Sequence, residues 1–339
     1  MKLVRVANVV FENAYGVEVN GGLVFVACGA DGAKFLDGKK VVSLPKRATV
    51  AAVDDAGTIA ALSRDGKWVG DRYEWQTELW SLSPAKKIAV LSKNESDDAA
   101  EPKIIVGDEI VCLRKRKGDR YSVRTFDRKG KLTGEAPLGK VPLPFHVAAS
   151  RDGAFVATAY FTGAAHLFDR KTKKSTSLAG GTLRIGRRHE KGIDTLAFDA
   201  AGEHVMYASS ASGAVHVWST RTKKSVSGGW QKEGASGGFF VAGGLATITE
   251  GGDGKTLTHH SLGAAKAKAQ VVVEADQVAA LGDDLHVAIA AGGTIAIVDV
   301  ATGKRVASVK APKAVRSLSA SSRVVAAFDG KSVVAFAIE

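Results

Sequence analysis

The sequence predicts an all-β protein built from repeated antiparallel units, and three recurring features predict it. Short apolar runs return along the 339-residue chain at a spacing of about 40 residues. Turn residues flank these runs, and 38 glycines against 7 prolines suit a fold with many tight turns. In most units a further strand ends in an aromatic or apolar residue followed by a short polar one. Together these features favour many short strands over helices.

The stretch from His189 to Ser219 is the clearest unit. It predicts one strand that ends at Phe198, a second from Val205 to Ser210 and a third that ends at Trp218, with glycine turns between them. This order resembles the WD40 repeat, in which a Gly-His precedes a strand, a glycine turn, a second strand, an Asp-Gly turn and a strand ending in Trp-Asp. The resemblance implies a β-propeller of four-stranded antiparallel blades.

The unit also departs from the family pattern. In WD40 repeats the His, a strand Ser or Thr, a turn Asp and the Trp hydrogen-bond to one another, so the resemblance gives His189 and Trp218 structural roles. The strand hydroxyl is replaced by Ala208 and the terminal Asp by Ser219. We therefore expect this blade to depend on apolar packing more than on that polar network.

The unit recurs in weaker copies. Each copy has an apolar run where a central strand is expected: 23–28, 58–62, 109–113, 155–161, 205–210, 245–249, 285–290 and 324–328. Endings such as Trp80-Ser81, Phe126-Asp127, Phe168-Asp169 and Val298-Asp299 are degenerate forms of Trp-Asp. These landmarks give about eight units of about 42 residues, within the range for a four-stranded blade, and seven blades stay open as the alternative.

The two ends of the chain predict how the ring closes. Residues 3–7 form an apolar strand that has no partner before it, and residues 333–338 form one that has no strand after it. Because an open ring would leave unpaired strand edges, we expect the N-terminal strand to complete the last blade.

The composition predicts one domain over residues 1–339, located in the cytoplasm. No Pro/Ser-rich linker divides the chain, and residues 92–102 form only a polar loop. The N-terminal residues lack the continuous apolar core of a secretion signal, and no run reaches the roughly 18 to 20 apolar residues of a membrane span. Cys28 and Cys112 fall in central strands, where buried free thiols are ordinary. Reduced thiols without a signal are typical of a cytoplasmic protein.

Positive charge is the broadest functional indication. A net charge of +12 favours acidic partners, namely an acidic protein surface, nucleic acid or an anionic lipid surface. Many cations follow tight turns at equivalent points of successive units: 37–40, 84–87, 128–131, 170–174, 220–224 and 301–305. If the units are blades, these turns share one face of the disc. Lysines there also solvate exposed turns and protect outer strand edges from pairing.

Two further basic clusters are expected on the opposite face. One lies in the turn between the second and third strands of the third unit and contains Arg114, Lys115, Arg116 and Lys117; the other precedes His189 and contains Arg184, Arg187 and Arg188. Arginine clusters can bind phosphates or carboxylates in bidentate fashion. Readers of single-stranded nucleic acid interleave such charges with aromatic platforms, and only Tyr121 lies near the first cluster.

The second unit carries an enlarged turn that is rich in aromatic residues. Trp68, Arg72, Tyr73 and Trp75 lie together in it. Trp, Tyr and Arg are the residue types most enriched at interface hot spots. This turn is the first candidate for a partner-binding site, and the alternative is that its aromatic residues pack on a neighbouring blade.

Catalytic and metal-binding patterns are weak. Gly252-Asp253-Gly254-Lys255 lacks the glycine spacing and the following helix of a phosphate loop, so a hairpin turn is expected there. No paired carboxylates, nucleophile elbow or His-x-His pattern is present, so we expect no metal, no cofactor and no enzymatic activity. The resemblance implies a monomeric scaffold that docks protein partners. The alternatives are a basic adaptor for nucleic acid or another anionic surface, and an enzyme with a site at the central channel.

Overall fold

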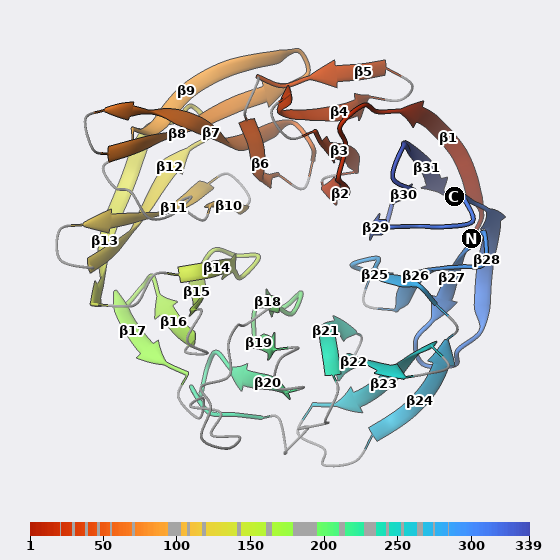
Figure 1. Ribbon diagram of the computed structural model, residues 1–339. Coiled ribbons are helices and arrows are strands. Elements are labelled where there is room, and N and C mark those ends of the chain that lie inside the picture. The colour runs from red at the N-terminus through yellow and green to blue at the C-terminus, as the bar shows by residue number, and fades with distance from the viewer. Residues whose placement is uncertain are drawn as a thin grey trace.

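The computed structural model forms eight antiparallel sheets arranged in a ring around a central axis, which is the eight-bladed β-propeller that the sequence predicts (Figure 1). The structure describes residues 1–20, 22–28, 31–37, 40–45, 48–54, 56–69, 72–93, 103–106, 109–116, 120–140, 144–160, 165–178, 195–209, 214–226, 235–241, 244–251, 254–262, 267–273, 275–283 and 285–339.

The strands of the first four blades follow chain order from the innermost to the outermost strand. Blade 1 holds β2 (Gly16–Asn20), β3 (Leu23–Ala27), β4 (Ala33–Asp37) and β5 (Lys40–Ser43); blade 2 holds β6 (Ala48–Val53), β7 (Ile59–Val69), β8 (Arg72–Leu82) and β9 (Ala85–Lys93). Blade 3 holds β10 (Lys103–Val106), β11 (Glu109–Arg116), β12 (Arg120–Asp127) and β13 (Leu132–Lys140); blade 4 holds β14 (Pro144–Ala149), β15 (Phe155–Tyr160), β16 (Ala165–Asp169) and β17 (Lys174–Ser177).

The remaining blades continue the same order, with two variations. Blade 5 holds β18 (Thr195–Phe198), β19 (His204–Ser209) and β20 (Ala214–Ser219), and among its described residues only the bridge between Trp218 and Ser225 marks a fourth position. Blade 6 holds β21 (Ala235–Val241), β22 (Gly244–Gly251), β23 (Gly254–Ser261) and β24 (Ala267–Val273); blade 7 holds β25 (Gln277–Ala280), β26 (His286–Ala291), β27 (Thr294–Asp299) and β28 (Arg305–Lys310). Blade 8 holds β29 (Ser317–Ala320), β30 (Val324–Phe328), β31 (Ser332–Ile338) and, as its outermost strand, β1 (Leu3–Val10).

Burial changes across each blade, and this explains its composition. In blade 7 the two middle strands are buried along nearly their whole length, while the outermost strand β28 is largely exposed and the innermost strand β25 is half-buried. Middle strands are covered by a neighbouring blade on both sides, so they are near-continuous Val, Ile and Ala runs. All eight predicted central strands are the second strands of blades.

The apolar core is divided among the seams between blades. The described residues form eight clusters of buried side chains, and each cluster joins two consecutive blades. At the seam between blades 8 and 1, for example, Phe328 and Ala335 pack with Val17 and Val26. Because every seam has its own cluster, including this last one, the ring is closed by apolar packing throughout.

The N-terminal strand closes the ring as predicted. β1 pairs antiparallel with β31 from Leu3, opposite Ile338, to Val10, opposite Ser332. The two termini therefore lie side by side at blade 8 (Figure 1). Leu3 and Ala7 are buried, each with 6% of its surface exposed, so β1 adds apolar contacts as well as backbone hydrogen bonds.

Strand direction gives the disc two distinct faces. We call the face with the turns between first and second strands and between third and fourth strands the lower face. The upper face carries the turns between second and third strands and the connections from one blade to the next. Among the described residues no helix is long and apolar enough to cross a bilayer.

Candidate functional site

The lysine-bearing turns share the lower face, as the sequence predicts. They join the third and fourth strands of blades 1, 2, 3, 4 and 7 and follow β20 in blade 5. Many of their cations are exposed: Lys40, Lys86, Lys87, Lys129, Lys131, Lys171, Lys173, Lys174, Arg221, Lys224, Lys304 and Arg305. The lower face therefore has a rim of positive charge.

Some cations of these turns hold neighbouring blades together. The Arg128 guanidinium of blade 3 donates to the Asp54 carboxylate and the Thr58 hydroxyl of blade 2, each at 2.7 Å. Asp54 also accepts from the backbone N–H groups of Thr58 and Ile59. Burial raises the pKa of Asp54, but the hydrogen bonds from Ile59, Thr58 and Arg128 outweigh burial and lower it overall.

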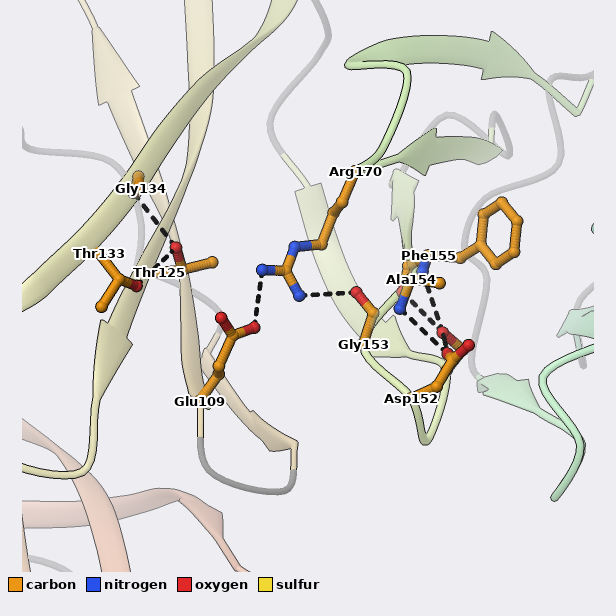
Figure 2. Close-up of polar contacts among 10 residues, drawn as sticks. Glu109, Thr125, Thr133, Gly134, Asp152, Gly153, Ala154, Phe155 and Arg170 are labelled. Carbon is orange, nitrogen blue, oxygen red and sulfur yellow. Dashed lines mark hydrogen bonds and ion pairs between the residues drawn. The ribbon is translucent and has the colours of Figure 1, made fainter.

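The same contact recurs one blade further on. Figure 2 shows the Arg170 guanidinium of blade 4 lying between Glu109 of blade 3 and the turn of its own blade; it lies 2.7 Å from the Glu109 carboxylate and donates to the Gly153 carbonyl at 2.7 Å. In blade 5, Lys223 extends back over the Phe155 ring of blade 4, with Nζ 4.2 Å from the ring centroid. These three side chains act at the seams, so part of the lower-face charge is structural.

The enlarged turn of blade 2 is a two-stranded ribbon on the upper face. The four-stranded part of the blade ends where Arg64 pairs with Gln76. Beyond it, β7 and β8 continue as a pair alone, and Trp68 lies directly opposite Tyr73. Trp75 lies at the register shift that separates the ribbon from the blade. Trp75 therefore lies at the base of this projecting ribbon, and Trp68, Arg72 and Tyr73 lie toward its tip.

The basic cluster of blade 3 lies on the same face in the next blade. Arg114, Lys115 and Arg116 occupy the upper end of β11, past the point where β10 begins, and the register pairs Arg116 with Arg120. Leu113 packs against blade 4 while Cys112 packs against blade 2, so alternation turns Arg114 toward the seam with blade 2. The structure therefore places two of the predicted partner-binding clusters on adjacent blades.

The other predicted positions cannot be placed. Lys117, Arg184, Arg187, Arg188 and His189 lie outside the described residues. Tyr121, the aromatic residue nearest the blade 3 cluster, is only 5% exposed and packs in the seam with blade 4. It is not available as a stacking platform, which weakens the nucleic-acid interpretation.

Trp218 of blade 5 is buried, with 8% of its surface exposed. It packs with Tyr207 and Val205 at the seam with blade 4. Within the described part of the chain, neither its indole nitrogen nor the Tyr207 hydroxyl completes a hydrogen bond of normal geometry. Burial raises the pKa of Tyr207, and the neighbouring Trp218 side chain opposes this effect. Both side chains thus belong to the apolar cluster between blades 4 and 5.

A buried carboxylate that sequence analysis missed lies below the ribbon. Glu78 in β8 is fully buried and accepts hydrogen bonds at 2.8 Å from the Gln76 amide and the Trp80 indole N–H. The Lys87 ammonium lies 3.5 Å away. These contacts satisfy the charge and fix β8 directly beneath the projecting part of the blade. A single Glu between Thr77 and Leu79 carries no periodic signal that would have revealed it.

A second missed feature is a pocket of about 280 Å³ at the seam between blades 1 and 2. Its walls are the upper ends of β2, β3, β4 and β6, and most of its lining is apolar, including Val17, Phe25, Ala33 and Val50. Tyr15 lies at its mouth with 64% of its surface exposed. The pocket brings together residues more than thirty positions apart, so no local sequence pattern could have predicted it.

Cys28 also borders this pocket, while its side chain packs in the apolar cluster at the seam with blade 8. It is buried, and burial raises its pKa, while Lys34 lowers and Asp31 raises the pKa to smaller extents. Cys112 is likewise buried, and both thiols are free. Among the described residues, no three His, Cys, Asp or Glu side chains gather closely enough to hold a metal ion.

Comparison with known proteins shows the fold alone. No family model matches the chain, and none of the curated proteins matches it in sequence. Among solved structures, BamB from Moraxella catarrhalis is similar with a TM-score of 0.64 over 99% of this chain and 100% of that one. The two sequences are only 14% identical. The likeness shows the propeller fold, and the function has to be argued from the surface of this chain.

Proposed function

We propose that this propeller is a non-catalytic, WD40-like scaffold that docks a protein partner in the cytoplasm through its upper face over blades 2 and 3. The observation that carries the proposal is the two-stranded ribbon of blade 2, which extends past the sheet and carries Trp68 and Tyr73 directly opposite each other. Two-stranded ribbons are marginally stable in water by themselves, so a bound partner would stabilise this one.

The residue types on this surface support a protein partner. Trp, Tyr and Arg bury large areas while keeping a polar group for hydrogen bonding, and they dominate interface hot spots. The neighbouring blade 3 cluster adds Arg114, Lys115 and Arg116. The ladder there pairs two arginine positions, and like charges directly opposite each other are destabilising. An acidic segment of the partner would relieve that repulsion.

A second candidate function is adhesion to an anionic surface through the lower face. It is favoured by the exposed lysines and arginines that the turns of six blades present on that face. Binding of this kind would weaken steeply with salt and would tolerate changes on the upper face.

Affinity capture with paired variants tests the first proposal. The ribbon variant Trp68→Ala/Trp75→Ala should keep the unfolding temperature of the wild type and lose at least about tenfold in partner recovery, since hot-spot truncations cost upwards of 2 kcal/mol. The matched control is Ile88→Ala/Val90→Ala, which removes exposed apolar side chains from the outer strand of the same blade. Recovery that is unchanged by the ribbon variant, or lost on nuclease treatment, would refute the proposal.

A further inference from the structure

We propose that the pocket between blades 1 and 2 binds one large apolar side chain of a protein partner, at a point where the partner also carries a lysine or arginine. The proposal rests on the protein-docking function and names the chemistry of one docking point. It is independent of the ribbon residues, so the two can fail separately.

The size and lining of the pocket favour a single side chain. Its volume of about 280 Å³ is at or below the roughly 300–1,000 Å³ of sites that enclose whole small molecules. Phe25 and Ala33 line it from blade 1, and Ala48 and Val50 line it from blade 2. An aromatic or large aliphatic group entering from the upper face would exchange water for apolar contacts on both sides.

The charge around the pocket selects a basic neighbour. Among the described lining residues, Glu18 carries the ionised group, and it is exposed. Its carboxylate accepts a hydrogen bond from the Asn20 amide. Asp31, which precedes the lining residue Gly32 in sequence, is exposed as well and accepts a hydrogen bond from the Asn13 amide. In a chain with a net charge of +12, the ionised group of the described lining is therefore a carboxylate.

Among the described cations, Lys34 lies next to a lining residue in sequence but on the other side of the sheet. Lys34 follows Ala33 in β4, and Phe35 packs toward blade 2 while Leu36 packs toward blade 8. Alternation therefore turns Lys34 to the side of the sheet that faces away from the pocket.

Tyr15 provides a platform for the basic group. Its backbone N–H donates to the Ala27 carbonyl at 3.1 Å, which fixes the residue at the mouth while 64% of its surface stays exposed. A lysine or arginine that approaches Glu18 can also lie over an aromatic ring, whose face attracts cations. An apolar residue in the pocket and a cation at its mouth would thus be recognised together.

Gly16 offers a way to fill the pocket without disturbing the blade. A Cβ atom added at Gly16 would meet no heavy atom within 4 Å, and its backbone does not need glycine, so Gly16→Leu should fold. Gly237 is a matched control, because it also lies in an innermost strand with open space around an added Cβ. Gly237→Leu should leave the pocket unchanged.

The probes are three capped peptides titrated by calorimetry or NMR: acetyl-Gly-Phe-Lys-Gly-amide, the same peptide with Glu in place of Lys, and the same peptide with Ala in place of Phe. The wild type and Gly237→Leu should prefer the Phe-Lys peptide. Gly16→Leu should weaken its binding at least about tenfold, since the apolar side chain loses its site. Glu18→Gln should weaken it about two- to fivefold and leave the Phe-Glu peptide unaffected or slightly improved, as for an exposed ion pair.

Three results would overturn the inference. They are the absence of detectable Phe-Lys binding to the wild type at millimolar concentration, equal binding to Gly16→Leu, and equal binding of the Phe-Lys and Phe-Glu peptides. Partner capture separates this inference from the docking function. If the ribbon variant loses the partner while Gly16→Leu retains it fully, the pocket proposal fails and the docking function stands.

Discussion

Glu78 shows how a single buried residue supports the proposed surface. Its carboxylate is fully buried, and replacing it by Leu would leave the Trp80 indole N–H and the Gln76 amide without their acceptor. Loss of one member of a buried charged network costs about 3 kcal/mol. We expect Glu78→Leu to lower the free energy of unfolding by about that amount in urea titrations. Glu203→Leu, at an exposed turn position, should change it by less than about 0.5 kcal/mol. Equal effects of the two substitutions would show that the network does not stabilise blade 2.

Asp54 should make the free energy of unfolding depend on pH. The pKa of Asp54 is lowered in the folded protein, because its hydrogen bonds outweigh the effect of burial. Its contribution is therefore complete above the unfolded-state pKa of about 3.9 and is lost as the pH falls through the lower folded-state value. Asp54→Asn should reduce the free energy of unfolding by about 1–2 kcal/mol at pH 7, and the difference from the wild type should shrink below pH of about 4. The control is Asp276→Asn, at an exposed position. A difference that stays constant down to pH of about 3 would contradict this role of Asp54.

At the same scale, the sequence predicted the state of single residues better than their contacts with other parts of the chain. Cys28 and Cys112 were expected to be buried free thiols, and the structure confirms both. The partners of Asp54 and Glu78 were not foreseen. Asp54 and Arg128 are 74 positions apart and meet only because blades 2 and 3 are neighbours.

At the scale of elements, the second strands of the blades were the most predictable. Strands such as β30 are buried on both sides, so selection for apolar residues acts along their whole length and leaves a continuous run. Innermost strands such as β25 and β29 are half-buried at every position and leave no such run. The sequence predicted the ribbon as an aromatic turn. Its extension past the sheet could not be predicted, because it depends on where β6 begins and where β9 ends.

The strongest prediction for a single element concerns the contribution of the N-terminal strand to thermal stability. Deleting residues 1–10 removes the outermost strand of blade 8, its ladder with β31 and the buried Leu3 and Ala7. Loss of a buried leucine alone costs about 2–5 kcal/mol, so we expect the truncated chain to lose cooperative thermal unfolding. A synthetic peptide of residues 1–12 added in trans should restore it. Unchanged thermal stability of the truncated chain would show that ring closure does not depend on β1.

At the scale of the whole molecule, the seams set the number of blades. The sequence repeats predicted about eight blades, with seven as an alternative. Degenerate repeat motifs do not show which units pack against each other, so they left the number of blades open. Eight separate apolar clusters, one at each seam, confirm the count of eight. The common face of the lysine-bearing turns was also predictable, since equivalent turns of successive blades must lie on the same side. The pocket was not predictable from the sequence, because it forms between two blades and belongs to neither repeat.

We propose that the upper face over blades 2 and 3 docks a protein, and photo-crosslinking distinguishes this face from the lower one. A photoreactive phenylalanine analogue would replace Tyr73 on the upper-face ribbon or, in a second chain, Lys173 in a lower-face turn. We predict that irradiation joins position 73, and not position 173, to a protein partner that also survives nuclease treatment. Crosslinks from position 173 alone, or crosslinks from position 73 only to nucleic acid, would contradict the claim.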